Sequence, residues 1–223
     1  MFLCTVRRGI IMTIKDSVYT VGSNLSNVGK LPCSSFNLSA GHCKTGAKLV
    51  KIEGSVCFGC YALGGNYQRF GHIESMKPKT ARINSPQWVK SMAHLISTQN
   101  KGDTDYFRWH DSGDIQSVSH LRKIVEVCNL TPGVNHWLPT REYKFVKDYL
   151  KIYGNFPANL MVRLSAHMVD QLPPNIQGTT GSAVADKETP KGFVCPAPTQ
   201  GGQCVDCRAC WDIKQPLVTY HKH

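Results

Sequence analysis

Cysteine thiols are the side chains of this 223-residue chain whose spacing most clearly indicates chemistry. Eight of its ten cysteines fall into two groups of four: Cys33, Cys43, Cys57 and Cys60, then Cys195, Cys204, Cys207 and Cys210. The second group reads C-x8-C-x2-C-x2-C and has a proline directly after its first cysteine. Thiols this close in sequence form disulfides or bind a zinc ion or an iron–sulfur cluster.

The redox compartment separates these possibilities. The stretch "MFLCTVRRGII" breaks its apolar residues with Arg7 and Arg8 and lacks a small-residue cleavage site, and a start at Met12 would remove it altogether. No run approaches the roughly 18 apolar residues of a membrane span. We therefore expect a cytoplasmic protein without a membrane partner, in which clustered cysteines bind metal more often than each other. Cys128, in the apolar phase of "HLRKIVEVCNL", is expected to be a core thiol.

The charge of the chain indicates a class of partner. Lysine and arginine number 26 against 15 aspartates and glutamates, a formal net charge of +11. Such a surplus favours contact with a polyanion and speeds encounter with one. A nucleic-acid or nucleotide partner is therefore expected, although no single basic run locates the contact.

The middle of the chain alternates expected strands with expected helices. Strands are predicted at 105–110, 134–138, 158–166 and 180–185, and helices at 87–99, 117–130 and 141–153. This alternation is typical of parallel βαβ units, in a chain too short for a full eight-unit barrel. The predicted fold class is α/β, a partial or compressed (β/α) barrel or a small open sheet. One domain is expected, with a cysteine-rich segment 31–70, a βα core 80–185 and a metal-binding appendage 190–223.

Polar side chains follow three of the expected strands. They are His110, Asp111 and Asp114 after the first, Pro139, Thr140 and Arg141 after the second, and Ser165 and His167 after the third. In parallel α/β folds the active groups gather at the carboxyl ends of the strands. The pattern predicts one shared site, with helix caps and turn residues as the alternative interpretation.

The stretch "CFGCYA" resembles the end of the cluster-binding loop of radical S-adenosylmethionine proteins. The segments "WHDSGDIQ", "TPGVNHWLPTRE" and "PANLMVRLSAH" are similar in order and spacing to the barrel strands of bacteriophage-borne radical-SAM-like proteins, over roughly residues 43–167. The resemblance implies one or two [4Fe–4S] clusters, S-adenosylmethionine as cofactor, and an electron donor as partner. Three cysteines would leave one iron for the cofactor, whereas Cys33 as a fourth ligand would close that position.

The same resemblance assigns roles to individual residues. Tyr61 would stand beside the last cluster cysteine, and Arg163 and Ser165 would hold the cofactor's carboxylate or ribose. Asp111 or Asp114 would take the place of the acidic strand end that binds the methionine amino group. His110 and Arg141 would face the substrate, where a planar arginine suits a phosphate.

The second cysteine group has two interpretations. Its C-x2-C-x2-C run with a distant Cys-Pro is close to the ferredoxin arrangement in reverse order, which indicates a second iron–sulfur cluster. A structural zinc ion bound by four cysteines is the alternative.

Two other functions fit parts of the sequence. "DSGDIQ", "LPTR" and "CVDCRAC" resemble segments of guanine transglycosylases that insert 7-deazaguanine bases, which implies that Asp111 handles the base and that Cys204, Cys207, Cys210 and His221 bind zinc. Asn135 stands where those enzymes carry a nucleophilic aspartate. A non-catalytic, zinc-stabilised nucleic-acid-binding module needs fewer assumptions but leaves the polar strand ends without a role.

Overall fold

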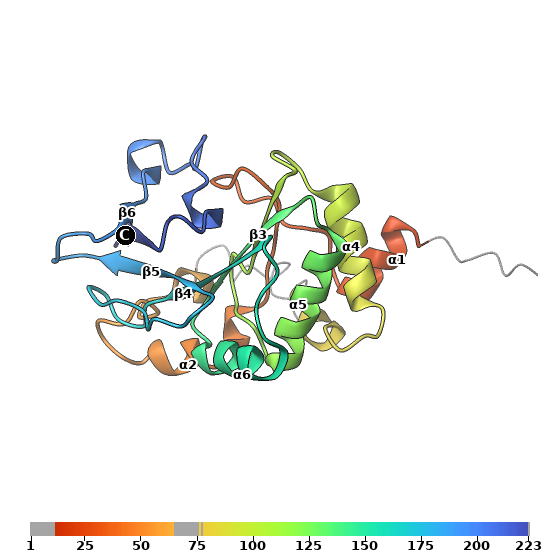
Figure 1. Cartoon of the computed structure of the whole chain (residues 1–223), viewed down its shortest axis with the longest axis horizontal. Helices are drawn as coiled ribbons and strands as arrows, with labels where there is room; N and C mark the ends of the chain where they lie inside the picture. The colour runs from red at the N-terminus through yellow and green to blue at the C-terminus, as the bar shows by residue number, and fades with distance from the viewer. Residues whose placement is uncertain (1–11, 65–75, 77, 223) are drawn as a thin grey trace, which may run out of the picture.

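A parallel β-sheet forms the centre of the protein (Figure 1). The computed structural model describes residues 12–64, 76 and 78–222, so Cys4 lies outside the described residues. Within these residues seven strands pair in the order β1-β2-β3-β4-β5-β7-β6, all parallel. They are β1 Ser35–Phe36, β2 Tyr106–Trp109, β3 Asn135–Thr140, β4 Leu160–Ser165, β5 Thr180–Ala185, β6 Phe193–Val194 and β7 Leu217–His221. This confirms the α/β class.

The helices follow local signals in the sequence. They are α1 Ile14–Val21, α2 Gly46–Leu49, α4 Trp88–Gln99, α5 Val118–Leu130 and α6 Tyr143–Tyr153, with 3-10 turns η1 Ala40–His42, η2 Tyr61–Leu63, η4 Ala197–Thr199 and η5 Ala209–Trp211. Ser117 begins α5, since its hydroxyl accepts from the His120 N–H at 3.1 Å, and Gly154 ends α6. The predicted helices and the four predicted strands are confirmed, whereas α1, β1, β6 and β7 were not expected.

The two faces of the sheet have different surroundings. Phe107 and Trp109 of β2 join the main core with Trp88 of α4 and Leu121 of α5. Successive residues of a strand point to opposite faces, so Arg108 of β2 points away from these helices. We call this side the inner face and define it by Tyr106, Arg108, Trp137, Arg163 and Ser165. The C-terminal segment, which carries the second cysteine group, packs on it through Trp211, whose indole N–H donates to the Phe107 carbonyl at 3.0 Å.

Arg163 attaches that C-terminal segment to the sheet. Its side chain is 0% exposed, and all five of its N–H donors have backbone carbonyl acceptors. The acceptors are Cys210 at 3.4 Å, Gly181 at 2.8 Å, Gln215 at 2.9 Å, Ala209 at 3.1 Å and Asp212 at 3.3 Å. Four of these carbonyls lie in η5 or in the residues that follow it. The guanidinium thus stabilises the fold of residues 209–215 against the inner face.

The outer strands of the sheet are β1 and β6, and among the described residues no pairing joins them into a closed barrel. Strands β1 to β5 nevertheless lie side by side in chain order. Figure 1 shows α1 and α4 at one end of the molecule and the C-terminal segment at the other. None of the helices in the described ranges has the length and apolar character that crossing a bilayer requires.

Replacing Arg163 by methionine should destabilise the C-terminal segment strongly. Methionine fills similar space but removes the guanidinium donors of five backbone carbonyls, at a cost of about 3 kcal/mol or more. Urea unfolding measures the global effect, and hydrogen exchange of residues 209–215 measures local detachment.

Arg122→Met is the matched control, because Arg122 forms an exposed pair with Glu126 on α5 and such pairs contribute about 0 to 1 kcal/mol. Equal stability and equal exchange in the two variants would contradict the anchoring role of Arg163.

Candidate functional site

Cys43, Cys57 and Cys60 lie on the segment that follows β1, and this segment crosses the carboxyl ends of the strands. The Val56 N–H donates to the His167 carbonyl at 3.0 Å, and the Val169 N–H donates to the Gly54 carbonyl at 2.9 Å, which fixes the segment to the residues after β4. The Tyr61 hydroxyl donates to the Asp111 carbonyl at 2.9 Å, directly after β2. We call residues 43–61 the three-cysteine loop.

Glu142 fixes the beginning of this loop. One carboxylate oxygen accepts from the backbone N–H groups of Lys44 at 3.1 Å and Thr45 at 2.7 Å, and the other accepts from the Thr45 hydroxyl at 2.8 Å. The carboxylate therefore satisfies N–H groups at the start of α2, where negative charge is favourable. Sequence analysis missed Glu142, although an acid directly after the polar end of β3 was a usable signal.

Two thiols of the loop, those of Cys43 and Cys57, face a common point. A Cβ atom built on Gly46 would lie 3.7 Å from the Cys43 Sγ, 3.9 Å from the Cys57 Sγ and only 2.9 Å from the Cys43 Cβ, so glycine leaves room for both side chains. Burial raises the pKa of the Cys43 thiol to about 12, and the charges of Cys57 and Cys60 raise it further. The three cysteines therefore form one electrostatic group.

Arg141 lies at the same group. Burial raises the pKa of Cys57, and the positive charge of Arg141 opposes that increase. The buried Arg141 Nε has no hydrogen-bond partner among the described residues. Its backbone is fixed on both sides, because the N–H donates to Asp114 at 2.9 Å and the carbonyl lies 3.0 Å from the His167 Nε2. Of the residues that sequence analysis assigned to the substrate, Arg141 is the one that the structure brings to the three cysteines.

Asp114 and Asp111 have different environments. Asp114 accepts from the Thr140 hydroxyl at 2.6 Å, the Ile115 N–H at 2.7 Å and the Arg141 N–H, which joins the end of β2 to the end of β3. Burial raises the pKa of Asp114 to about 6, and these hydrogen bonds oppose the increase. Asp111 accepts from the Ser35 hydroxyl at 2.9 Å through one carboxylate oxygen. Asp114 thus positions the neighbouring strand ends.

His110 is placed apart from the three-cysteine loop. Its backbone turns out of β2 with φ 53°, and its ring is buried next to the His120 ring of α5 at 5.4 Å between centroids. Burial lowers the pKa of His110 to about 3. The ring therefore lies in the layer between the sheet and the helices.

The two residues assigned to the cofactor on β4 lie on the inner face. All the donors of Arg163 are occupied by backbone carbonyls, so it has none left for a cofactor. The Ser165 hydroxyl accepts from the Ser182 hydroxyl of β5 at 3.1 Å. Neither has a described hydrogen bond to the three-cysteine loop, whereas Tyr61 belongs to that loop.

Cys33 is separate from the three loop cysteines with which its sequence position grouped it. Cys33 precedes β1 and Cys43 follows it, so the two cysteines lie beyond opposite ends of that strand. Cys33 packs with Trp137 and Trp211, and Cys210 packs against this cluster. Burial raises the pKa of Cys33 to about 12, and the charge of Cys204 acts in the same direction. Cys33 therefore lies beside the second cysteine group.

The second cysteine group is attached to the sheet and to the segment before β1. The Cys204 N–H donates to the Lys30 carbonyl at 2.9 Å, and the Cys195 N–H donates to the Thr219 carbonyl of β7 at 2.8 Å. Burial raises the pKa of Cys204, and the charges of Cys195 and Cys207 raise it further. A cavity of about 550 Å³ opens beside Cys207, between this segment and the first residues of β2 and β3.

Tyr220 rather than His221 accompanies Cys210. The Tyr220 hydroxyl lies 3.2 Å from the Cys210 sulfur. Because alternate residues of a strand point to opposite faces, His221 points away from that sulfur. The structure therefore does not gather the Cys204, Cys207, Cys210 and His221 set that the transglycosylase resemblance implied.

Metal binding depends on how these donors converge. Within residues 12–64, 76 and 78–222, no three cysteine, histidine, aspartate or glutamate side chains are gathered as ligands of a metal ion. The donor types still suit iron–sulfur or zinc chemistry, since both are bound by cysteine thiolates. The facing of Cys43 and Cys57 toward one point agrees with a shared ligand between them.

Comparison with known proteins places the chain in a family. A family model described as Gene product 88 matches residues 13–213. The chain belongs to the Gene product 88 family. This family is of the phage type, as the sequence resemblance implied, and no match shows a radical-SAM or a transglycosylase family. Neither the curated proteins nor the solved structures give a match to this Gene product 88 protein.

Glu142→Gln should loosen the start of the three-cysteine loop. The amide retains one acceptor oxygen but loses the charge and turns an N–H group toward donors, so the amides of Lys44 and Thr45 should exchange roughly tenfold faster. Hydrogen exchange with mass spectrometry over residues 43–60 measures this change.

Glu126→Gln, an exposed substitution on α5, should leave exchange in the loop unaltered. The assigned role of Glu142 is wrong if exchange over residues 43–60 is the same in both variants.

Asp114 should make stability depend on pH. Its folded pKa of about 6 lies above the usual value of 3.8, so the folded state binds the proton more tightly than the unfolded state. Stability from this group is present below about pH 4 and is lost as the pH rises through about 6, a change on the order of 3 kcal/mol. In Asp114→Asn that loss should disappear.

Urea unfolding of both proteins from pH 4 to 7.5 measures the difference in free energy of unfolding. The difference should change between pH 4 and 6 and stay constant above 7. A difference that is constant over the whole range would contradict the raised pKa.

Proposed function

We propose that this Gene product 88 protein is a radical-SAM-like iron–sulfur enzyme that acts on nucleotides or nucleic acid. The observation that carries the proposal is the separation of Cys33 from Cys43, Cys57 and Cys60. Three thiolates would hold a [4Fe–4S] cluster and leave one iron without a cysteine ligand. That iron is the position that the amino and carboxylate groups of S-adenosylmethionine require.

The fold supports this proposal. Strands β1 to β5 are parallel and adjacent in chain order, and α4, α5 and α6 connect the strands from β1 to β4. We interpret the arrangement as a partial (β/α) barrel whose loop after the first strand carries the cluster ligands. Catalytic groups of such folds gather at the carboxyl ends of the strands, where the three-cysteine loop lies.

Several residues of the chain would serve the bound groups. A cluster with an open iron supplies a low-potential electron and a coordination position for the cofactor. The Arg141 charge beside Cys57 favours the thiolate form that ligation requires. Asp111 is the strand-end carboxylate best placed to accept from the methionine amino group, because both oxygens of Asp114 already accept hydrogen bonds. Glu142 would hold the loop in register with the strand ends.

The second cysteine group would hold a second iron–sulfur cluster, with zinc as the alternative. Cys33 brings a fifth thiol to Cys195, Cys204, Cys207 and Cys210. Arg163 does not bind the cluster or the cofactor in this proposal. It fixes the backbone at Cys210.

The position of Asn135 argues against base exchange. Asn135 is the first residue of β3, whereas Asp111 follows the last residue of β2. In a parallel sheet these positions lie at opposite ends of the strands. Asn135, which matches the transglycosylase nucleophile, is therefore distant from Asp111, which would handle the base.

Protein purified without oxygen should contain about eight irons and as many sulfides per chain, as expected for two [4Fe–4S] clusters. Single serine substitutions of Cys43, Cys57 or Cys60 should each remove about four irons and abolish reductive cleavage of S-adenosylmethionine. Iron and sulfide analysis, electron paramagnetic resonance and the cleavage assay make the measurement.

Cys33→Ser and Cys128→Ser are the controls, and both should retain the cleavage of S-adenosylmethionine. Cys128 is fully buried in the main core, away from either cysteine group. A colourless protein that holds zinc and no sulfide would overturn the proposal. Loss of cleavage in a Cys33→Ser protein whose second cluster is intact would contradict the three-cysteine assignment.

A further inference from the structure

Arg108 lies at the middle of the inner face. It is the third residue of β2 and pairs in register with Ser35 of β1 and Trp137 of β3. Its guanidinium lies over the Trp137 ring, 4.5 Å from the ring centroid. A planar cation on an aromatic ring is held in one orientation, with its edge available to a ligand.

Arg108 has no acidic partner in the part of the chain that the structure describes. Its Nε is buried without a hydrogen-bond acceptor, and the ion pairs of the described residues involve other arginines and lysines. A half-buried charge without an ion pair is costly, so the expected partner of Arg108 is negative, either the cysteine thiolates or a bound anion. Arg163, the other arginine of this face, differs because its donors are all occupied.

The charge of Arg108 reaches both cysteine groups. Burial raises the pKa values of Cys33, Cys204 and Cys210, and the Arg108 charge opposes each increase. The same charge opposes the increase that burial causes in the pKa of Tyr61, on the three-cysteine loop. The charge of Arg108 therefore acts on residues of both groups.

Lys30 adds a second cation to this region. Burial lowers the pKa of its ammonium and the nearby Arg108 charge lowers it further, whereas the charges of Cys204, Asp111 and Cys195 oppose the decrease. The Lys30 carbonyl accepts from Cys204, so its backbone is fixed beside the second cysteine group. An anion that contacts both side chains would relieve the repulsion between them.

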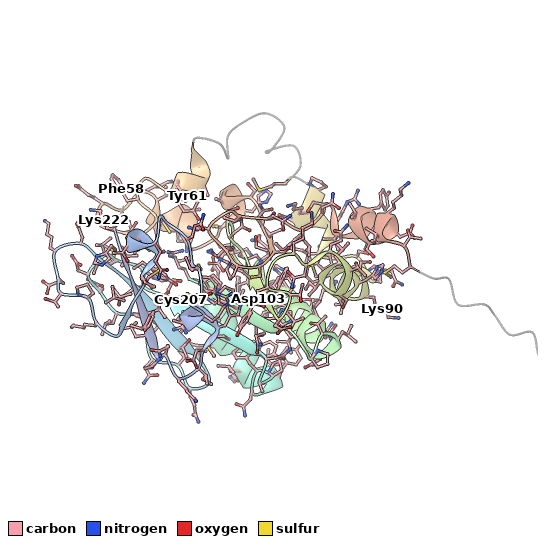
Figure 2. The ribbon with its side chains drawn as sticks, turned by 90° about the horizontal axis from the view of Figure 1, so that it is seen from above. Phe58, Tyr61, Lys90, Asp103, Cys207 and Lys222 are labelled. Carbon is pink, nitrogen blue, oxygen red and sulfur yellow. The ribbon has the colours of Figure 1, made fainter. Side chains whose placement is uncertain are left out.

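The three-cysteine loop carries exposed aromatic rings, and the Arg108 charge acts on one of them, Tyr61. Tyr61 is 61% exposed and Phe58 is 56% exposed, although most large apolar side chains are buried. Figure 2 shows both residues in the same region of the molecule, with Lys90 at the far end. Exposed rings beside cations are the combination that binds a base and its phosphate.

We infer that Arg108 and Lys30 bind a phosphate group of the substrate, whose base stacks on the exposed Tyr61 ring. Arginine donates two parallel hydrogen bonds to phosphate oxygens, and lysine adds a point charge. This inference deepens the proposed function and rests on it, since it names the group by which the enzyme would hold its substrate. A free nucleotide and a nucleic-acid strand offer the same phosphate chemistry.

Binding to the full chain, purified without oxygen, tests the inference. The probes are the four 5′-nucleoside monophosphates, the corresponding nucleosides and a single-stranded 12-nucleotide DNA, measured by calorimetry. The variants are Arg108→Gln, Arg108→Lys and Lys30→Gln. Lys90→Gln on α4 and Arg122→Gln on α5 are the controls, because both remove an exposed charge far from the inner face.

We expect the phosphorylated probe to bind at least tenfold more tightly than its nucleoside. Arg108→Gln should weaken binding at least tenfold and Lys30→Gln about threefold, while both controls stay within twofold of the unsubstituted chain. Arg108→Lys should fall between, since it keeps the charge but loses the paired donors. If a thermal melt shows that Arg108→Gln is not folded, the binding measured with Arg108→Lys tests the role of Arg108 instead.

Which probe responds to Arg108 identifies the source of the phosphate. A monophosphate that binds as tightly as the DNA indicates a free nucleotide, whereas Arg108-dependent binding of the DNA alone indicates a strand. Equal binding by Arg108→Gln and Lys90→Gln would overturn the inference and leave Arg108 as a counter-charge for the cysteine groups. So would the absence of any preference for the phosphorylated probe.

Failure of this inference can be distinguished from failure of the proposed function. Iron content and cleavage of S-adenosylmethionine are measured on the same preparations. An Arg108→Gln protein that keeps both but loses phosphate binding supports the inference. A chain without iron that still binds phosphate through Arg108 retains the phosphate site and loses the proposed enzyme.

Discussion

The hydrogen bonds of the buried Arg163 guanidinium join the C-terminal segment to the inner face of the sheet. One end of the chain otherwise contributes only the short strands β6 and β7 to the fold. Because Arg163 donates to carbonyls within η5 and directly after it, the positions of Cys210 and Trp211 depend on a strand that lies about fifty residues earlier in the sequence. Trp211 in turn covers Trp137 and Cys33, so Arg163 fixes the part of the second cysteine group that contains Cys210, while backbone hydrogen bonds to Lys30 and Thr219 fix Cys204 and Cys195.

A second network fixes the other cysteine group. Asp114 joins the ends of β2 and β3, Glu142 extends from the end of β3 to the start of α2, and the residues after β4 bind the segment before Cys57. None of these contacts uses a thiol. The backbone around the three cysteines is therefore held by carboxylates and carbonyls, which leaves the sulfur atoms available as ligands.

Regular periodicity made part of this fold predictable from the sequence. Helices α4, α5 and α6 and strands β2 to β5 carry their own apolar patterns and end signals. Strands β1 and β6 have two residues each and form only because distant strands pair with them, so no local pattern could reveal them. The sequence therefore grouped Cys33 with Cys43, whereas the structure places β1 between them.

The candidate site was predictable to a similar extent. The polar strand ends and the loop cysteines were identifiable from residue types and spacing. The contribution of Arg163 was not, because its partners are backbone carbonyls, which leave no signature in the sequence. Arg108 was missed because an arginine inside an aromatic strand gives no indication of the face to which it points.

The position of β1 between Cys33 and Cys43 has a consequence for how other molecules could approach the two cysteine groups. Cys207 lines the cavity beside the first residues of β2 and β3, whereas the three-cysteine loop lies at the carboxyl ends of the strands. A reductant docking at the cavity would leave the three-cysteine loop clear for a substrate. Under the proposed function, the electron donor and the substrate would then bind at different ends of the strands and would not compete for one surface.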